Sequence, residues 1–196
     1  MRSSPPIALS SSCDLEKKWN AKKDHDKHFC DHHHPVNFNV GKIAGGDWAS
    51  SVPSWCTFDM RVGVLPTQTL KECRQEVEDT IRQAAAKDPF LGNNLPVVSW
   101  EGFQAEPYIL QNHEHVRELL AAAHKTVFGA ELDDRRTTGT TDARFFGLYA
   151  GLPALVYGPQ SDDVHGFDER VNMESVRKIT QSTALFIAEW CGLEKV

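Results

Sequence analysis

Three features typical of membrane, nucleic-acid-binding or disulfide-stabilised proteins are missing from this 196-residue sequence. No apolar run reaches the length that a membrane-spanning helix needs. Acidic residues outnumber basic ones by 27 to 21, and this balance argues against nucleic acid as a partner because phosphate binding requires clustered Lys and Arg. The Cys count of 5 is odd and no CxxC pair occurs, which favours a reduced, cytoplasmic protein.

The N-terminal segment, residues 1–13, is rich in serine and proline, and we expect it to be disordered. It is too short and too interrupted by proline for a convincing signal peptide. With 40% hydrophobic residues, the rest of the chain has enough apolar material for a core. Its length allows one large domain or two small ones.

Periodicity in residues 14–104 predicts the order helix, strand, strand, helix, strand. The expected elements are a helix ending at Lys23, strands over 37–43 and 55–64 that pair antiparallel, a helix over 67–87 and a strand over 95–100. Leu15 and Trp19 share one face of the first helix, and Thr69 with Glu72 can form a capping box at the start of the second. This order is a split-βαβ layout without its first strand.

Residues 105–196 are expected to combine helices with one short buried strand. The expected elements are a helix over 112–127 capped by Asn112, a helix over 145–150, a strand over 154–157 and a last helix that begins after Asn172. Gly129 and Gly151 are suited to end the first two helices in the left-handed conformation. Three histidines near the first of these helices are interpreted as surface residues: His113, His115 and His124.

A histidine-rich run, HDKHFCDHHHP over residues 25–35, leaves two interpretations open. Its potential metal ligands are His25, His28, Cys30, His32, His33 and His34. Such a composition is compatible with metal binding. However, the spacing does not match a closed structural zinc site, and three adjacent histidines point in different directions. A solvated loop is therefore the favoured interpretation.

The stretch over residues 137–169 concentrates the side chains with chemical potential. A turn of small residues precedes Asp142 and Arg144, and a later loop carries His165. Arg offers a planar fork that suits a carboxylate, and Asp can hold that fork in place. A loop histidine at the carboxyl end of a strand is a plausible zinc ligand. The alternatives are a solvated histidine and a local Asp–Arg ion pair.

Three motifs in this stretch resemble a known family. The run TGTTDARFF is followed by G-L-P-x-x-x-Y-G-P and then by H-G-F-D-E, with order and spacing kept across residues 138–169. This resembles the C-terminal part of the zinc aminoacylases, the family of acetylornithine deacetylase, succinyl-diaminopimelate desuccinylase and carboxypeptidase G. The resemblance extends from residue 14 to the C-terminus. It implies an α/β protein in which residues 14–104 form an incomplete lid, or dimerisation domain, and residues 105–196 form the end of the catalytic domain.

The resemblance also implies roles for individual residues. His165 would be a ligand of a two-zinc site, and the substrate pocket would be lined by Gly139, Thr140, Asp142 and Arg144. Arg61 would reach the carboxylate of the substrate. On chemistry alone, Arg61 could instead form a cross-strand ion pair.

The implied activity is hydrolysis of a small N-acyl amino-acid-like amide by a homodimer that associates through the lid. Zinc would polarise the carbonyl and supply hydroxide. Each zinc needs about three protein ligands and a water. The family takes nearly all of these ligands, and the general base, from a segment before the lid that this sequence does not contain. We therefore expect the chain to be inactive alone, as a C-terminal fragment. The alternative is a non-catalytic dimerisation module, so whether this chain is itself an enzyme stays open.

Overall fold

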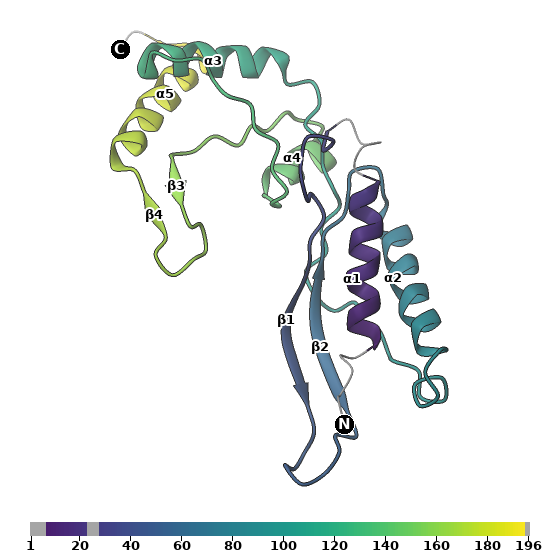
Figure 1. Cartoon of the computed structure of the whole chain (residues 1–196). Coiled ribbons are helices and arrows are strands. Elements are labelled where there is room, and N and C mark those ends of the chain that lie inside the picture. The colour runs from purple at the N-terminus through teal and green to yellow at the C-terminus, as the bar shows by residue number, and fades with distance from the viewer. Residues whose placement is uncertain (1–6, 23–27, 195–196) are drawn as a thin grey trace. The chain divides into compact units, whose positions relative to one another are not determined.

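The computed structural model describes residues 7–22 and 28–194, and it has the mixed α/β character that the sequence predicts (Figure 1). The elements in chain order are α1 (Ile7–Ala21), β1 (Phe38–Gly45), β2 (Cys56–Val62), α2 (Leu70–Ala85), α3 (Glu114–Phe128), α4 (Ala143–Ala150), β3 (Ser161–Asp162), β4 (Arg170–Val171) and α5 (Met173–Cys191). They form two compact units. The first unit holds Met1–Pro107 with Arg136–Thr140, and the second holds Tyr108–Arg135 with Thr141–Val196. Their assignment as lid and catalytic portion stays a prediction.

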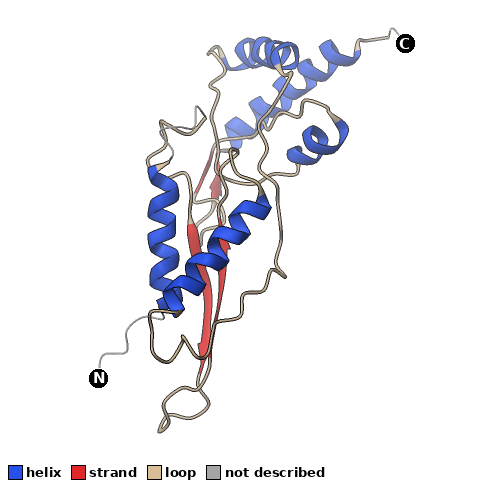
Figure 2. Cartoon of the chain, turned by 90° about the vertical axis from the view of Figure 1, so that its right-hand side faces the viewer, coloured by secondary structure: helices blue, strands red, loops and turns tan. Residues whose placement is uncertain are grey.

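In the first unit, α1 and α2 lie over one face of the antiparallel β1–β2 ribbon (Figure 2). The ribbon turns Phe58 and Val62 toward the helices and leaves Thr57 and Asp59 exposed, as the alternation predicts. The buried core consists of Leu15, Trp19, Val36, Leu65, Cys73, Val77 and Ile81. The apolar stripe on α2 and the antiparallel ribbon are therefore both confirmed.

The second predicted helix, expected over 67–87, is α2 over Leu70–Ala85, and its start carries the predicted sequence signal. Thr69 is the N-cap of α2, its side chain accepts from the Glu72 amide, and the Glu72 carboxylate accepts from the Thr69 amide. This reciprocal pair satisfies two backbone N–H groups that have no partner inside the helix. The predicted capping box is present.

Side chains of α1 hold the start of β1 in place. The Asn20 side chain accepts a hydrogen bond from the Val36 amide at 3.1 Å and donates to the Val36 carbonyl at 2.8 Å. Four residues earlier on the helix, Glu16 Oε1 accepts from the Phe38 amide at 2.9 Å. The two side chains thus satisfy backbone groups that a neighbouring strand would otherwise pair.

Two predictions for the first unit are wrong. Residues 7–13, expected to be disordered, belong to α1, and Ser12 is buried there because α1 packs along α2. The expected strand over 95–100 is not formed. Val98 and Trp100 do face the core and Val97 is 93% exposed, so the alternation is real. Alternation reports which side chains are buried, and it does not supply the backbone partner that a strand needs.

In the second unit, α3 packs against α5. Gly129 ends α3 at φ 69° and Gly151 ends α4 at φ 64°, so both left-handed caps are confirmed. Asn172 caps α5, as predicted, by accepting from the Ser175 amide at 3.0 Å. The N-cap of α3 is His113 and not Asn112, whose φ of 50° points the chain away from a capping geometry.

The expected strand over 154–157 is also absent from the described second unit. The ordered strand pair lies farther along, where β3 and β4 form a hairpin with Ser161 opposite Val171 and Asp162 opposite Arg170. This hairpin was not anticipated, because strands of two residues leave no periodicity to detect. It carries the loop that contains His165.

Candidate functional site

Arg144 is the most deeply placed of the predicted substrate-binding residues. It lies in the first turn of α4 with only 5% of its surface exposed, and its guanidinium carbon lies 4.1 Å from the centre of the Phe145 ring. Burial of an arginine costs folding free energy unless its charge interacts with a partner group. The sequence motif thus singled out an arginine that is buried, unlike the exposed arginines of the chain.

Asp142 does not hold the Arg144 fork. It occupies the N-cap position of α4 and accepts from the Phe145 amide through its backbone oxygen at 3.0 Å, while its side chain makes no cap hydrogen bond. Within the described residues its carboxylate is in no ion pair. Both the predicted support of the fork and the alternative of a local Asp–Arg pair are therefore wrong.

The small-residue turn before α4 is exposed. The Gly139 amide donates to the Thr137 hydroxyl at 3.0 Å, which closes a local turn. By its contacts, the turn through Gly139 and Thr140 belongs to the first unit, whereas Asp142 and Arg144 belong to the second. The chain thus passes from one unit to the other inside the predicted pocket motif.

Arg61 lies on the exposed face of β2, opposite Asn39. It makes no ion pair within the described residues, and the cross-strand pair on this ribbon joins Lys42 to Asp59 at 3.7 Å. The ion-pair alternative for Arg61 is therefore wrong, and its predicted role as a substrate contact is untested by the structure.

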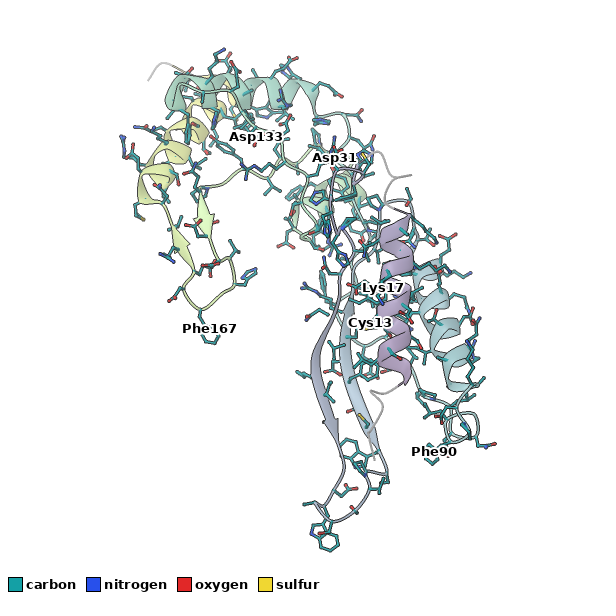
Figure 3. The ribbon with its side chains drawn as sticks, viewed as in Figure 1. Cys13, Lys17, Asp31, Phe90, Asp133 and Phe167 are labelled. Carbon is teal, nitrogen blue, oxygen red and sulfur yellow. The ribbon has the colours of Figure 1, made fainter. Side chains whose placement is uncertain are left out.

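His165 lies in the exposed loop between β3 and β4. Its backbone is left-handed, at φ 65°, as is that of Asp163 at φ 51°. The Gly166 amide donates to the Asp163 carbonyl at 2.6 Å and closes the turn. Phe167 projects from the tip (Figure 3). Residues other than glycine in this backbone region are uncommon, and such strain gathers at functional sites.

The described residues do not by themselves fit a two-zinc centre. Figure 1 draws α4 apart from the tip of the hairpin, and no hydrogen bond or ion pair joins His165 to Asp142. In the ranges 7–22 and 28–194, no three His, Cys, Asp or Glu side chains are grouped so that they could hold a metal ion. The donor set here is thus one exposed imidazole, which is too little for either zinc.

The histidine-rich run serves partly as a structural loop. His25 lies outside the described residues. Of the others, His32 Nε2 lies 3.2 Å from the Arg136 carbonyl oxygen, and His34 Nε2 lies 3.1 Å from Glu16 Oε1. These contacts tie the loop to other parts of the first unit.

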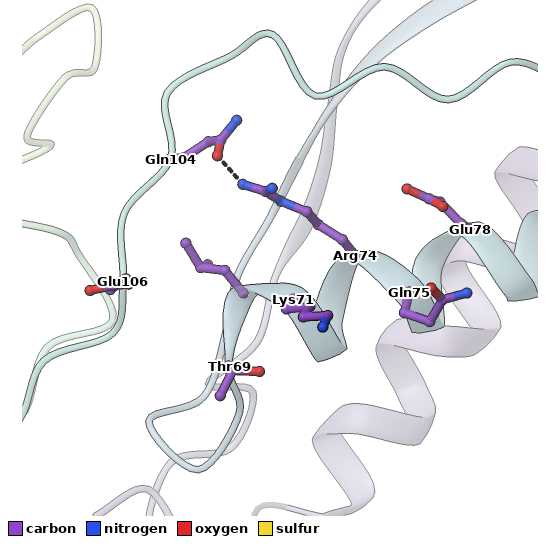
Figure 4. A pocket seen from close by; sticks show the side chains of 8 residues that line it. Thr69, Lys71, Arg74, Gln75, Glu78, Gln104 and Glu106 are labelled. Atoms are coloured by element: carbon purple, nitrogen blue, oxygen red, sulfur yellow. Dashed lines mark hydrogen bonds between the residues drawn. The ribbon is translucent and has the colours of Figure 1, made fainter.

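A hollow of about 550 Å³ lies beside the start of α2, and none of its lining residues is a predicted site residue (Figure 4). Its lining residues are Thr69, Leu70, Lys71, Arg74, Gln75, Glu78, Gln104 and Glu106. The Arg74 guanidinium donates to Gln104 across it and also lies 5.7 Å from the centre of the Trp100 ring. The Arg74 guanidinium thus already contacts the Gln104 side-chain amide and the face of the Trp100 ring.

Sequence reasoning missed the groups that anchor the His165 hairpin. His124 was interpreted as a surface residue, but it is partly buried and its Nδ1 lies 2.7 Å from the Tyr157 hydroxyl. The Gln160 amide donates to Ser175 Oγ at 3.0 Å. The tyrosine of the Y-G-P motif was the available signal, since a partly buried tyrosine usually finds a hydrogen-bond partner.

Two further findings concern membrane-spanning helices and the cysteines. Within the described ranges, none of the helices combines the length and the apolar character that crossing a membrane requires. The five cysteines all lie within the described residues, and no disulfide joins any of them. Cys73 is buried, and that burial raises the pKa of its thiol to about 11.

Among the curated proteins that this chain resembles, two have the same name. N-formyl-4-amino-5-aminomethyl-2-methylpyrimidine deformylase from Halalkalibacterium halodurans is 25% identical over 166 residues, which cover 80% of this chain and 39% of that protein. Its namesake from Bacillus subtilis is 25% identical over 196 residues, which cover 93% of this chain and 44% of that protein. The chain therefore spans about two-fifths of the length of the curated relatives it matches.

The family assignment does not depend on those relatives. The model of the peptidase family M20/M25/M40 matches residues 13–189, which is most of the chain and includes every residue singled out from the sequence motifs. Members of this family are hydrolases and are generally metal-dependent, commonly through zinc. The chain belongs to peptidase family M20/M25/M40.

Proposed function

We propose that this chain supplies part of a metal-dependent amidohydrolase that removes an acyl group, formyl or acetyl, from a small amine. Hydrolysis adds water across the carbon–nitrogen bond, so the products are a carboxylic acid and the free amine. Support comes from the family match over residues 13–189 and from the deformylase names of two relatives. An acetylornithine-like substrate, expected from the motifs, remains one member of this class.

The observation that carries the proposal is the placement of Arg144. A buried guanidinium at the start of a helix, directly after an exposed turn of small residues, is suited to bind an anionic group of a substrate. We propose that Arg61 also contacts that group, and that Gly139, Thr140 and Asp142 line the pocket. His165 would be one metal ligand, and the described residues do not supply the others.

A second candidate is a dimerisation module, favoured by the state of the β1–β2 ribbon. Its outer face is exposed, and within the described residues β1 and β2 pair only with each other, so each has a free edge. Free edges pair readily with another chain. We propose the lid, residues 14–104, as the surface of a homodimer. A monomer on a sizing column at micromolar concentration would rule out this second candidate.

The hydrolase proposal is tested best in a relative that has the remaining residues. In the Bacillus subtilis deformylase, the matching portion would be replaced by residues 13–189 of this chain, and amine release from N-formyl and N-acetyl amines would be measured. Arg144→Gln in the graft should lower turnover at least tenfold, because a charged hydrogen bond is worth about 1.5–3 kcal/mol. The matched control is Arg82→Gln, since the Arg82 side chain is exposed and, among the residues that the structure describes, pairs only with Asp79.

A folded chimera that releases no amine from any of these substrates would refute the hydrolase proposal. Folding is judged separately, from a single cooperative melting transition and a single peak on a sizing column. A smaller graft of residues 137–169 repeats the test with less change in packing.

A further inference from the structure

We propose that His124 and Tyr157 are positioning residues. They fix the root of the β3–β4 hairpin, residues 157–160, and thereby set the orientation of the loop that carries His165. The inference rests on the proposed function for the role of His165, but the contacts that carry it are independent of that role. All of them lie within the second unit.

The first contact joins α3 to the segment that leads into the hairpin. His124 Nδ1 and the Tyr157 hydroxyl are 2.7 Å apart, and both side chains are partly buried. One helical turn later, the Phe128 ring stacks on the His124 ring with centres 4.2 Å apart and planes 9° from parallel. From the neighbouring helix α5, Lys178 Nζ lies 5.4 Å from the centre of the Phe128 ring. The imidazole is therefore held in orientation by packing as well as by its hydrogen bond.

The second contact lies three residues farther along and fixes the same segment to α5. The Gln160 amide donates to Ser175 Oγ at 3.0 Å, and Ser175 Oγ donates to the Asn172 carbonyl at 2.6 Å. The Asn172 amide donates to the Gln160 carbonyl at 2.9 Å, and this bond closes the hairpin at its base. Ser175 is buried, so these bonds are shielded from water.

Residues 157–160 are thus fastened at one end to α3 and at the other to α5, the two helices that pack together in this unit. Pro159 between the two fastenings restricts the backbone further. By contrast, the hairpin beyond the base is exposed and is paired through two residues of each strand. The direction of the His165 loop therefore depends on how firmly its root is held.

Amide hydrogen exchange on the full chain tests this directly, with no requirement for activity. Tyr157→Phe deletes one oxygen, and His124→Phe keeps the stacking partner of Phe128 but removes the hydrogen bond. Either change should speed exchange of the Gly166 and Asn172 amides by on the order of fivefold, since one hydrogen bond is lost. Exchange in α3 and α5 should stay as in the unchanged chain.

The matched control is Tyr149→Phe. Tyr149 is 67% exposed on α4, and its hydroxyl makes no hydrogen bond within the described residues, so exchange in the hairpin should not change. His124→Asn, whose amide can replace Nδ1, should restore slow exchange, which a loss of ring packing alone would not do. Unchanged hairpin exchange in Tyr157→Phe would overturn the inference, and so would a uniform rise across the whole unit.

The two proposals fail in different ways. If His165 is not a metal ligand, the hairpin still loosens in Tyr157→Phe. If His124 and Tyr157 do not hold the hairpin, Tyr157→Phe leaves hairpin exchange unaffected, while Arg144→Gln in the chimera still lowers turnover.

Discussion

Replacing Asn20 by alanine tests whether a side chain takes the place of a neighbouring strand. Asn20 is buried, and its amide group makes both the 3.1 Å hydrogen bond from the Val36 N–H and the 2.8 Å bond to the Val36 carbonyl. It also donates to the Glu16 carbonyl at 3.0 Å. Asn20→Ala removes these three bonds together with the 3.3 Å contact between Asn20 Nδ2 and His34 Nε2.

The magnitude follows from what is left behind. Val36 is 1% exposed, so water has little access to its backbone groups once the amide is gone. A buried donor or acceptor without a partner costs about 1–3 kcal/mol, and two such groups cost about 2–6 kcal/mol. Partial entry of water lowers this figure, so we expect a loss of roughly 3 kcal/mol, a large share of the roughly 5–15 kcal/mol that stabilises a domain. Asn20→Asp should be no milder, because a carboxylate oxygen would then face the Val36 carbonyl.

The assay is urea unfolding followed by tryptophan fluorescence, combined with amide exchange at Val36. Trp19 is a suitable reporter, since it is fully buried and packs edge-on to Phe38 at 5.2 Å. Asn39→Ala is the control, because Asn39 is exposed on β1. If Asn20→Ala costs no more than this control and the Val36 amide stays protected, the reasoning is wrong.

Two further predictions concern a carboxylate and a glycine. Burial raises the pKa of Glu76, but hydrogen bonds from Lys18 at 2.7 Å and the Trp19 indole at 2.9 Å outweigh it and hold the pKa below its ordinary value. Because the folded pKa is the lower one, this stabilisation is present above the ordinary pKa and is lost as pH falls through the folded value. Glu76→Gln should therefore flatten the loss of stability in urea titrations between pH 5 and pH 3, and a slope equal to that of the unchanged chain would contradict this. Separately, a Cβ on Gly166 would lie 2.8 Å from a backbone oxygen of its own turn, whereas a Cβ on Gly102 meets nothing within 4 Å. Gly166→Ala should speed amide exchange in the β3–β4 hairpin and Gly102→Ala should not; equal effects would argue against this turn geometry.

The elements that could be predicted are those whose signal is local. The α2 stripe through Val77 and Ile81, the Thr69 cap and the glycine ends of α3 and α4 all depend on residues within one or two turns. Such signals are complete in the sequence, because the groups they satisfy belong to the same segment.

The elements that could not be predicted depend on partners far along the chain. Residues 95–100 alternate correctly, yet among the described residues they pair with neither β1 nor β2 of the first unit. Backbone groups at the start of β1 are instead hydrogen-bonded by the Asn20 and Glu16 side chains of α1, and the sequence pattern of β1 does not predict these bonds. The helical state of residues 7–13 likewise follows from packing against α2, which composition does not report.

The candidate site divides in the same way. The motif carrying Arg144 and His165 was visible as spacing, and the family match over residues 13–189 includes it. The expected carboxylate support of Arg144 was not found, because adjacency in sequence did not bring the Asp142 side chain to it. Contacts from α3 and α5 to the hairpin, by contrast, connect residues 15 and 33 positions apart, a separation that no local pattern encodes.

The central claim, that His165 belongs to the metal site of an M20 amidohydrolase, is tested most directly by counting zinc. The Bacillus subtilis chimera carrying residues 13–189 would be purified with and without His165→Ala, and zinc per chain would be measured by atomic emission. We predict that the variant loses bound zinc together with amine release, whereas His33→Ala, at an exposed position of the histidine-rich run, changes neither. Full zinc occupancy and undiminished amine release in the His165→Ala chimera would contradict the claim.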